Sequence, residues 1–321
     1  MATALLFPGQ GSQAVGMGKA MAQAFPVAAE VFARVDAALG QKLSTIIFEG
    51  PEADLTLTAN AQPALMAVSL AGVAVLRQEA GLDIARDAKY VAGHSLGEYS
   101  ALCAAGALGL EDTARLLRIR GDAMQQAVPV GVGAMAAIIG LEFADVAALA
   151  AQAASEFYLQ AAICEAANDN GGGQVVISGS KQAVERAMEL AKLKGAKRAL
   201  LLPVSAPFHC ALMQPAADAM AKALAAVKIS TPAAPLIANT LASPVSDPEA
   251  IRAALVAQVT GTVRWRESVL FMAAQGVTRY VEIGAGKVLS GLVKRIAEGA
   301  AVSNVALPGD IPGFRAGPSA P

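Results

Sequence analysis

The feature that most constrains the fold is the pentapeptide Gly-His-Ser-Leu-Gly at residues 93–97. It matches the G-x-S-x-G pattern of a nucleophile elbow, a sharp turn from a strand into a helix in which glycines flank an exposed serine. The flanks agree, because residues 89–92 form a short strand-like run and residues 96–108 are rich in Ala and Leu at helical spacing. The pattern therefore predicts Ser95 as a nucleophile, against the alternative of a tight turn whose serine caps a helix.

Composition argues against several classes of protein. The chain of 321 residues is 55% hydrophobic, enough to fill a globular core, and its formal net charge is -1 without a basic block, so we expect neither a nucleic-acid-binding nor a membrane-binding surface. The amino terminus lacks the basic region of a signal peptide and charges interrupt the longer apolar segments, so we expect a cytoplasmic protein without a membrane span. The three scattered cysteines show no metal-ligand spacing and fit a reducing compartment: Cys103, Cys164 and Cys210.

Strand-like and helical segments alternate along most of the chain, which predicts an α/β fold. We expect one large catalytic domain to comprise residues 1–130 and 205–305, and the Pro- and Gly-rich segment 306–321 to be a disordered tail. Core strands are predicted at residues 3–7, 89–92, 237–239 and 280–284, and helices at 25–39, 63–79, 96–108, 111–128, 212–227 and 248–259.

Residues 131–204 are predicted to form a second domain, inserted into the first. The predicted order is strand 134–140, helix 143–154, strand 159–166, strand 174–179, helix 181–194 and strand 198–204, which is the βαββαβ order of a ferredoxin-like module. Proline and glycine concentrate at both of its edges, as expected where a chain crosses between domains. The glycine-rich turn at 168–174 is expected to be a hairpin loop or, alternatively, to line a cleft with its amides.

Arg120 is expected to point inward from the helix at 111–128. It shares one helical stripe with Leu116, Leu117 and Met124, three apolar residues at i, i+3 and i+4 spacing. A buried guanidinium needs a counter-charge, so Arg120 must meet either an internal carboxylate or an anionic ligand. The sequence leaves both possibilities open.

A serine nucleophile needs a general base, and the chain has two histidines. His94 is adjacent to Ser95 on a sharp turn, where successive side chains diverge, so His209 is the predicted base. No acidic residue stands out as a third member, since Asp218 lies on a predicted helix and Asp247 in a turn. A Ser-His dyad oriented by a main-chain carbonyl is at least as consistent with the sequence as a triad.

The loop at residues 8–14 offers a competing interpretation. Gly9, Gly11 and Ala14 satisfy the relaxed dinucleotide-binding pattern G-x-G-x-x-A, with acidic residues at a tolerable distance for a ribose. Pro8 interrupts the passage from strand to glycine turn, and isolated glycine-rich loops are common, so we treat this interpretation as the weaker one.

Five separated motifs together resemble the malonyl-CoA:acyl carrier protein transacylase family, over nearly the whole chain to about residue 300. The resemblance implies an α/β-hydrolase-like large domain with a parallel sheet and a ferredoxin-like insertion. It also implies transfer of malonyl from malonyl-CoA to the phosphopantetheine thiol of acyl carrier protein through a malonyl-serine intermediate. From a free-standing chain of this length we expect a role in primary fatty acid synthesis, and we expect a monomer that needs no cofactor and no metal. The motifs are Phe-Pro-Gly-Gln-Gly-Ser-Gln at 7–13, Gly-His-Ser-Leu-Gly-Glu-Tyr-Ser at 93–100, Arg-Gly at 120–121, Gly-Ala-Met at 133–135 and Phe-His at 208–209.

The same resemblance assigns roles to single residues. The turn at 168–174 departs from the Asn-Pro-Gly-Gln type associated with the family, because it holds three glycines. Phe208 is bulky enough to crowd the malonyl α-carbon and so to reject methylmalonyl, the alternative being ordinary packing. The implied site consists of Ser95 as nucleophile, His209 as base, the backbone amides of Gln10 and Leu96 as oxyanion hole, Arg120 for the malonyl carboxylate, and Gln258 beside His209.

Three other functions stay compatible with the elbow. A serine esterase or thioesterase uses the same turn, but a buried cation facing the serine would bring nothing to a neutral acyl group. An acyltransferase for other donors would differ in its donor preference. A carrier-protein docking module without catalysis would bind without needing Ser95.

Overall fold

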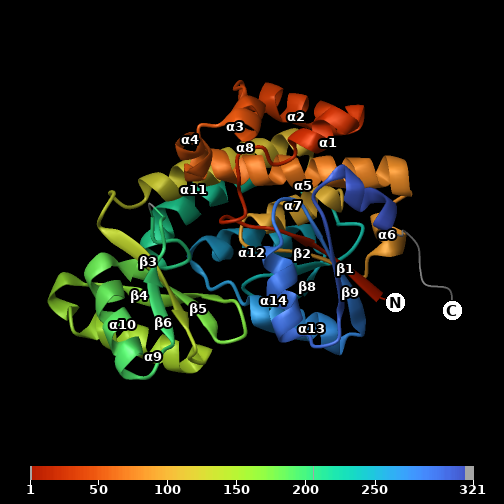
Figure 1. Cartoon of the computed structure of the whole chain (residues 1–321). Helices are drawn as coiled ribbons and strands as arrows, with labels where there is room; N and C mark the ends of the chain where they lie inside the picture. Colours follow the sequence, from red (N-terminus) through yellow and green to blue (C-terminus); the bar gives the residue numbers. More distant parts are fainter. Residues whose placement is uncertain (1, 205, 315–321) are drawn as a thin grey trace.

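The computed structural model describes residues 2–204 and 206–314. It is a mixed α/β structure with two separate sheets (Figure 1), one of six strands and one of four. The six-stranded sheet has the order β10-β9-β1-β2-β7-β8, and every pairing is parallel except that of β7 with β8. Its strands are β1 (Ala2–Phe7), β2 (Tyr90–Gly93), β7 (Leu236–Ala238), β8 (Ser243–Val245), β9 (Val277–Ile283) and β10 (Ala301–Val305).

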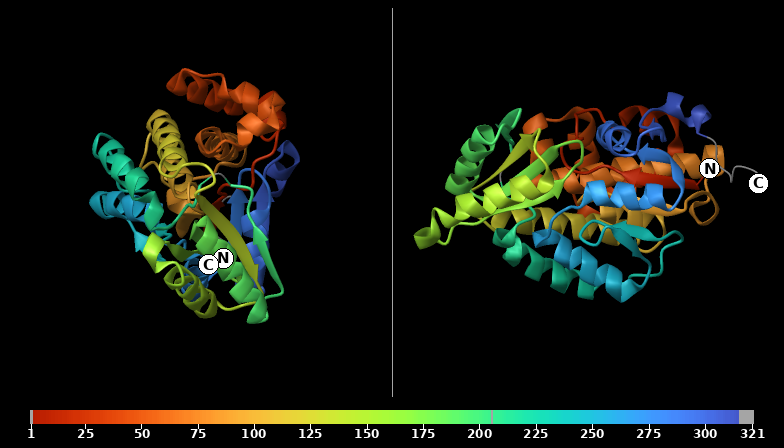
Figure 2. Two further views of the ribbon diagram at one scale, coloured as in Figure 1. Left: turned by 90° about the vertical axis from the view of Figure 1, so that its left-hand side faces the viewer. Right: turned by 90° about the horizontal axis from the view of Figure 1, so that it is seen from below.

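Strand β1 lies inside the large sheet and separates two hydrophobic cores. Leu5 and Phe7 pack into one core, whereas Ala4 and Leu6 pack into the other. This alternation follows from the period of two residues along a strand, and both faces are apolar because helices cover a parallel sheet on both sides. Figures 1 and 2 show this layering, with α5 on one side of the sheet and α13 and α14 on the other.

Helix α5 (Thr58–Ala80) is the longest helix described, and the fold surrounds it. It is the one described helix long and apolar enough to cross a membrane by length and composition, and 89% of its apolar window is buried inside the fold. Pro63 lies within its second turn, where the sequence predicts the helix to begin. The other helices of this part are α1 (Lys19–Ala24), α2 (Pro26–Leu39), α3 (Leu43–Glu49), α4 (Glu52–Thr56), α6 (Ile84–Asp87), α7 (Gly97–Ala104), α8 (Leu110–Gln126), α11 (Gln214–Ala225), α12 (Pro248–Thr260), α13 (Trp265–Ala274) and α14 (Val288–Ile296).

The four-stranded sheet is antiparallel and has the order β4-β5-β3-β6. Its strands and two helices build a hydrophobic core of their own, and they follow one another in the βαββαβ order expected from the sequence. The largest boundary error concerns the second strand, which begins at Cys164 instead of residue 159, because Tyr158–Gln160 forms a 3-10 helix and Ala161 is left-handed, with φ 49°. This strand also ends at Asp169 instead of 166, and the last strand ends at Leu201 instead of 204. The elements are β3 (Gly133–Ile139), α9 (Phe143–Ser155), β4 (Cys164–Asp169), β5 (Gln174–Ser180), α10 (Lys181–Leu193) and β6 (Arg198–Leu201).

The end of β4 pairs with the segment between α12 and α13. The amide of Asp169 donates to the carbonyl of Val263 at 2.9 Å, and the amide of Val263 donates to the carbonyl of Ala167 at 2.8 Å. Next to this bridge, the Arg266 guanidinium binds the buried Asp169 carboxylate at 2.8 Å. These contacts hold the small sheet beside the segment that precedes α13.

The carboxyl-terminal segment differs from its predicted disorder in the part that the structure describes. Residues Pro308–Gly313 form a 3-10 helix, and the side chains of Ile311 and Phe314 are buried. The Arg279 guanidinium lies 5.3 Å from the centre of the Phe314 ring. The rest of the predicted tail, residues 315–321, lies outside the described residues.

Candidate active site

Ser95 lies at the point where β2 turns into α7, in the left-handed conformation with φ 53° that an elbow requires. The two flanking glycines are needed on steric grounds. A Cβ added to Gly93 would overlap the backbone of Gly97, and one added to Gly97 would overlap the carbonyl oxygen of Phe7. The strand–elbow–helix geometry predicted from the pentapeptide is therefore present.

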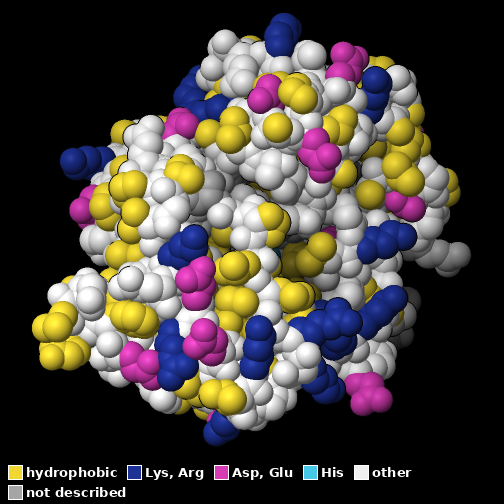
Figure 3. All heavy atoms as spheres, turned by 60° about the vertical axis from the view of Figure 1, so that its left-hand side comes forward, with side chains coloured by type: hydrophobic (Ala, Val, Ile, Leu, Met, Phe, Trp, Pro, Cys, Tyr) yellow, Lys and Arg dark blue, Asp and Glu magenta, His cyan; other side chains and the backbone are white. Residues whose placement is uncertain are grey.

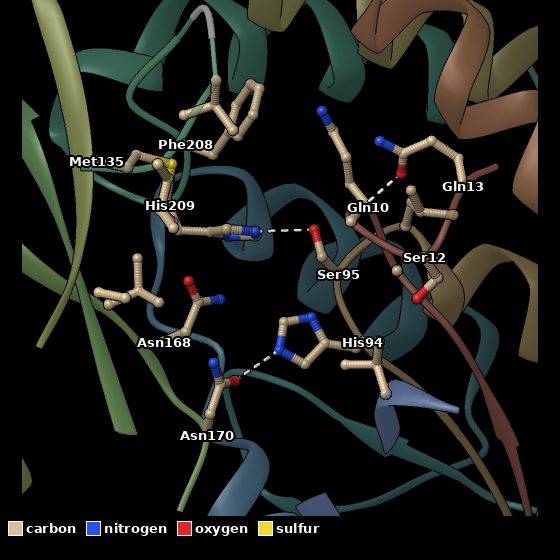
Figure 4. Close-up of a pocket in the computed structure, with 18 of the residues that line it drawn as sticks. Gln10, Ser12, Gln13, His94, Ser95, Met135, Asn168, Asn170, Phe208 and His209 are labelled. Carbon is tan, nitrogen blue, oxygen red and sulfur yellow. Dashed lines mark hydrogen bonds between the residues drawn. The ribbon is translucent and has the colours of Figure 1, made fainter. Parts of the chain in front are cut away.

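His209 lies against the serine, as Figure 4 shows. Its Nε2 is 2.8 Å from Ser95 Oγ, and its Nδ1 is 2.8 Å from the main-chain carbonyl oxygen of Gln258. A carbonyl can only accept, so Nδ1 carries the proton and Nε2 is left as the acceptor for the serine hydroxyl. The two aspartates named above are engaged elsewhere: Asp218 accepts from Gln214 Nε2, and Asp247 caps α12.

The environment keeps His209 neutral. Its side chain is buried, and burial, together with the positive charge of Arg120, lowers the pKa of His209 to about 3. At neutral pH the imidazole is therefore free to accept a proton.

Arg120 is 1% exposed and reaches from α8 to the serine. Its Nη2 donates to Gln258 Oε1 at 2.9 Å and to Ser95 Oγ at 3.1 Å, and its Nη1 donates to Gln62 Oε1 at 2.7 Å. Within residues 2–204 and 206–314, no carboxylate accepts a hydrogen bond from this guanidinium. Burial lowers the pKa of Arg120, yet a guanidinium stays protonated. Of the two possibilities left open by the sequence, this arrangement favours an anionic ligand.

Gln10 and Leu96 line the cavity together with Ser95. Leu96 follows the serine at the start of α7, and Gln10 lies in the loop after β1. Among the described residues, neither main-chain amide donates to another protein group. Donors arranged in this way can stabilise an oxyanion.

The glycine-rich loop after β1 packs against the elbow and does not lead directly into a helix. A Cβ on Gly9 would lie 2.5 Å from the carbonyl oxygen of His94, so only glycine lets the loop approach this closely. The next helix, α1, begins at Lys19, whereas a dinucleotide-binding loop opens directly into a helix. The geometry does not support the dinucleotide interpretation.

His94 faces away from the serine, as the divergence argument predicts. Its Nε2 lies 2.9 Å from Asn170 Oδ1, its ring centre is 5.7 Å from that of Trp265, and burial lowers its pKa. Asn168 and Asn170 line the cavity (Figure 4), so the turn of 168–174 takes part in the cleft through side chains. Its three glycines are all left-handed, with φ of 76°, 60° and 70°.

Sequence reasoning missed two buried residues behind the serine. Asn239, after β7, accepts from the Ser95 amide through Oδ1 at 2.8 Å and donates through Nδ2 to the Gly93 carbonyl at 2.7 Å. Glu98, on the first turn of α7, accepts from the Asn239 amide and from Gln258 Nε2. An acidic residue in an otherwise apolar helix directly after the elbow was the available signal for Glu98.

Ser95 opens into a cavity of about 380 Å³ between the two sheets. Figure 3 shows the hollowed face, with apolar side chains around the hollow and several Lys or Arg side chains beside it. In the described part of the chain, no group of three or more His, Cys, Asp or Glu residues could hold a metal ion. Apolar walls come from both halves of the molecule and include Met124, Met135, Val176, Phe208, Val288 and Leu292.

Comparison with known proteins gives one consistent result. The family model described as "Acyl transferase domain" matches residues 4–310. The chain is 48% identical over 295 residues to the malonyl CoA-acyl carrier protein transacylase of Escherichia coli (strain K12), which covers 92% of this chain and 93% of that protein. The corresponding protein of Bacillus subtilis (strain 168) is 47% identical over 293 residues, covering 91% and 90%.

Solved structures agree with the sequence relatives. An acyl-carrier-protein-S-malonyltransferase from Bartonella henselae has a TM-score of 0.94 and 58% identity, covering 98% of each chain. A malonyl-transacylase solved in complex with its type II PKS acyl-carrier protein has a TM-score of 0.92 and 43% identity, covering 97% of this chain and 98% of the other.

Proposed function

This chain belongs to the acyl transferase family, among its malonyl CoA-acyl carrier protein transacylases. We propose that Ser95 carries the malonyl group from the thiol of coenzyme A to the thiol of the carrier protein, with His209 as the base. The chain transfers malonyl from malonyl-CoA to acyl carrier protein. The observation that carries the assignment of the site is Arg120: a buried cation beside the serine, bonded to neutral oxygens and facing a cavity.

In the first half-reaction, Ser95 Oγ attacks the carbonyl carbon of the malonyl thioester. His209 Nε2 takes the hydroxyl proton, while its Nδ1 stays bound to the Gln258 carbonyl. The amides of Leu96 and Gln10 stabilise the oxyanion of the tetrahedral intermediate. When the carbon–sulfur bond breaks, His209 returns the proton to the departing sulfur, so coenzyme A leaves as a thiol and malonyl remains as an ester on Ser95.

The second half-reaction runs the same steps with another thiol. The phosphopantetheine thiol of the carrier protein gives its proton to His209 Nε2 and attacks the ester carbonyl. Collapse of the intermediate breaks the bond to Ser95 Oγ, which takes the proton back. Coenzyme A departs before the carrier thiol reacts, so the kinetics are ping-pong.

Arg120 selects the donor. A guanidinium can hold a carboxylate through two parallel hydrogen bonds, whereas an acetyl donor leaves the cation unpaired in a buried site. Burial is the largest cause of the lowered pKa of His209 and the Arg120 charge is the second; the bound carboxylate offsets the second, so the base is stronger when the malonyl donor is in place. Hydrogen bonds to Gln62 and Gln258 fix the positions of Nη1 and Nη2 before the donor binds.

Phe208 restricts the α-carbon of the donor. It precedes the base in sequence and lines the cavity (Figure 4). Its side chain is buried, with 8% exposure. A methyl branch on the malonyl α-carbon would compete with this ring for space, which supports a preference for malonyl over methylmalonyl.

The remaining features of the proposal concern the whole protein. The parallel sheet with a serine elbow supports an α/β-hydrolase-like large domain, and the strand order β4-β5-β3-β6 with two helices supports a ferredoxin-like insertion. We further propose a cytoplasmic monomer that takes coenzyme A thioesters and the acyl carrier protein of fatty acid synthesis and needs no cofactor, since the residues named above account for each proton and charge in the reaction.

The test is the intact-protein mass after brief incubation with malonyl-CoA or acetyl-CoA, followed by phosphopantetheinylated carrier protein. Wild type should gain a malonyl adduct that the carrier removes, and Ser95→Ala should gain none. Acetyl-CoA should give little adduct. A malonyl adduct discharged to water instead of to the carrier would identify a thioesterase, and equal adducts from both donors would refute the role given to Arg120.

A further inference from the structure

Glu98 is a buried carboxylate that the reaction scheme does not use. It lies one turn beyond Ser95 on α7, has 0% exposure and does not line the cavity. Burial raises the pKa of Glu98 to about 8, although hydrogen bonds from Asn239 and Gln258 and the charge of Arg120 act in the opposite direction. A carboxylate is costly to bury, and this one contacts Asn239 and Gln258, which hold Ser95, without lining the cavity itself.

The two oxygens of Glu98 bind two residues that hold the serine. Oε1 accepts the main-chain N–H of Asn239, whose side chain accepts from the Ser95 amide at 2.8 Å. Oε2 accepts from Nε2 of Gln258, which also donates to the Ser95 carbonyl at 2.9 Å. One carboxylate therefore restrains both sides of the elbow.

Glu98 and the Ser95 carbonyl together determine which way the Gln258 amide faces. Oε2 of Glu98 and the main-chain carbonyl of Ser95 both accept from Gln258 Nε2, so this end of the amide faces the elbow. The opposite end, Oε1, is then directed at Arg120 Nη2, 2.9 Å away. The reversed amide would set N–H groups against the N–H groups of the guanidinium and leave Arg120 without this acceptor.

We propose that Glu98 is a positioning residue for donor selection: together with the Ser95 carbonyl it fixes the orientation of the Gln258 amide, which holds Arg120 where a malonyl carboxylate can reach it. The inference rests on the proposed function. The main-chain carbonyl that orients His209 belongs to the backbone of α12 and does not depend on this amide. Loss of the Glu98 acceptors also loosens the elbow for both donors, so the specific signature of this role is a greater loss with malonyl-CoA than with acetyl-CoA.

The test is Glu98→Gln, an isosteric change that offers the Gln258 amide a second orientation. We expect the ratio of kcat/KM for malonyl-CoA over acetyl-CoA to fall at least tenfold. Gln258→Ala keeps the backbone carbonyl and removes the amide, so it should lower the ratio similarly, and the double variant should show no further loss. An unchanged ratio in Glu98→Gln, equal losses for both donors, or additive effects in the double variant would overturn the proposal.

Glu282 provides a matched control. It is equally buried, at 0% exposure, and accepts from Leu289 N, Ser290 N and Ser290 Oγ at the start of α14. Glu282→Gln should lower the Tm without changing the donor ratio. If Glu98→Gln does not fold, Gln258→Ala alone decides, since a retained ratio there refutes the inference. Absence of a malonyl-serine adduct in wild type would instead refute the proposed function.

Discussion

The guanidinium of Arg120 gives the site its chemical selectivity. Its three hydrogen bonds go to the amide oxygens of Gln62 and Gln258 and to Ser95 Oγ, so its charge is held without being neutralised. The planar fork, and not the charge alone, matches a carboxylate.

Arg120→Lys separates shape from charge. A lysine ammonium is a point charge on a flexible stem, so we expect kcat/KM for malonyl-CoA to fall about a hundredfold, which corresponds to about 3 kcal/mol. Arg115→Lys is the control, because that arginine lies on the same helix but on its exposed side, paired with Asp112. Steady-state kinetics with both variants are decisive, and a wild-type rate in Arg120→Lys would contradict bidentate binding.

The sequence predicted the residues of the site whose signals are local. Ser95 follows from the spacing of two glycines, and Arg120 from a helical stripe. Asn239 and Glu98 were missed because their hydrogen bond joins positions 141 residues apart, and nothing near either residue specifies the partner. The carbonyl that orients His209 is a backbone group, which no side-chain pattern can indicate.

At the level of elements, the packing of α8 on α5 carries Arg120 to the serine. Gly121 follows Arg120 and faces α5, where an added Cβ would lie 2.6 Å from Ala59 Cα and 2.7 Å from the Thr58 carbonyl oxygen. The absent side chain allows the backbones to approach, so that Arg120 Nη1 meets Gln62 of α5.

Gly121→Ala should therefore force α8 away from α5. We expect unfolding free energy to fall by about 1–3 kcal/mol, as for other overpacked interiors, and malonyl transfer to fall at least tenfold. Gly291→Ala on α14 is the matched helical glycine, because its added Cβ would meet nothing within 4 Å, and it should stabilise slightly. Urea unfolding and kinetics of both variants test this, and equal behaviour of the two would contradict it.

Strongly periodic elements were predictable, and those formed by pairing were not. Along strand β10, exposed residues alternate with partly buried ones, so its sequence carries little hydrophobic signal. The segment forms a strand because it pairs with β9. No helix was predicted at the position of α14, although its residues line the cavity. The start of β4 was predicted too early because Tyr158 and Leu159 are apolar residues of the kind found in strands. In the structure both side chains are largely exposed on a 3-10 helix.

At the scale of the whole molecule, the site depends on two sheets held together. The serine, its base and the arginine belong to the segments around the large sheet, whereas Met135, Asn168 and Val176 come from the small one. Folding therefore buries His209 in a cavity that neither sheet forms alone, and its protonation becomes linked to the stability of the entire chain.

The pKa of His209 falls from 6.5 to about 3 on folding, so between these values the unfolded chain binds a proton that the native chain does not. Stability from this group is complete above pH 6.5 and decreases as the pH falls. Relative to His209→Gln, wild type should lose on the order of 2 kcal/mol between pH 7.5 and pH 5. Urea unfolding of both proteins at the two pH values measures this, and a constant difference would contradict the burial of a neutral imidazole.

The place of β1 has a consequence for synthesis on the ribosome. This strand is hydrogen-bonded on one side to β2 and on the other to β9, and residues 8–276 lie between β1 and β9. While the chain is being translated, β1 therefore keeps one open edge until most of the protein has emerged, a state in which strands of two nascent chains can pair wrongly. The small sheet, contained within residues 133–201, can close long before.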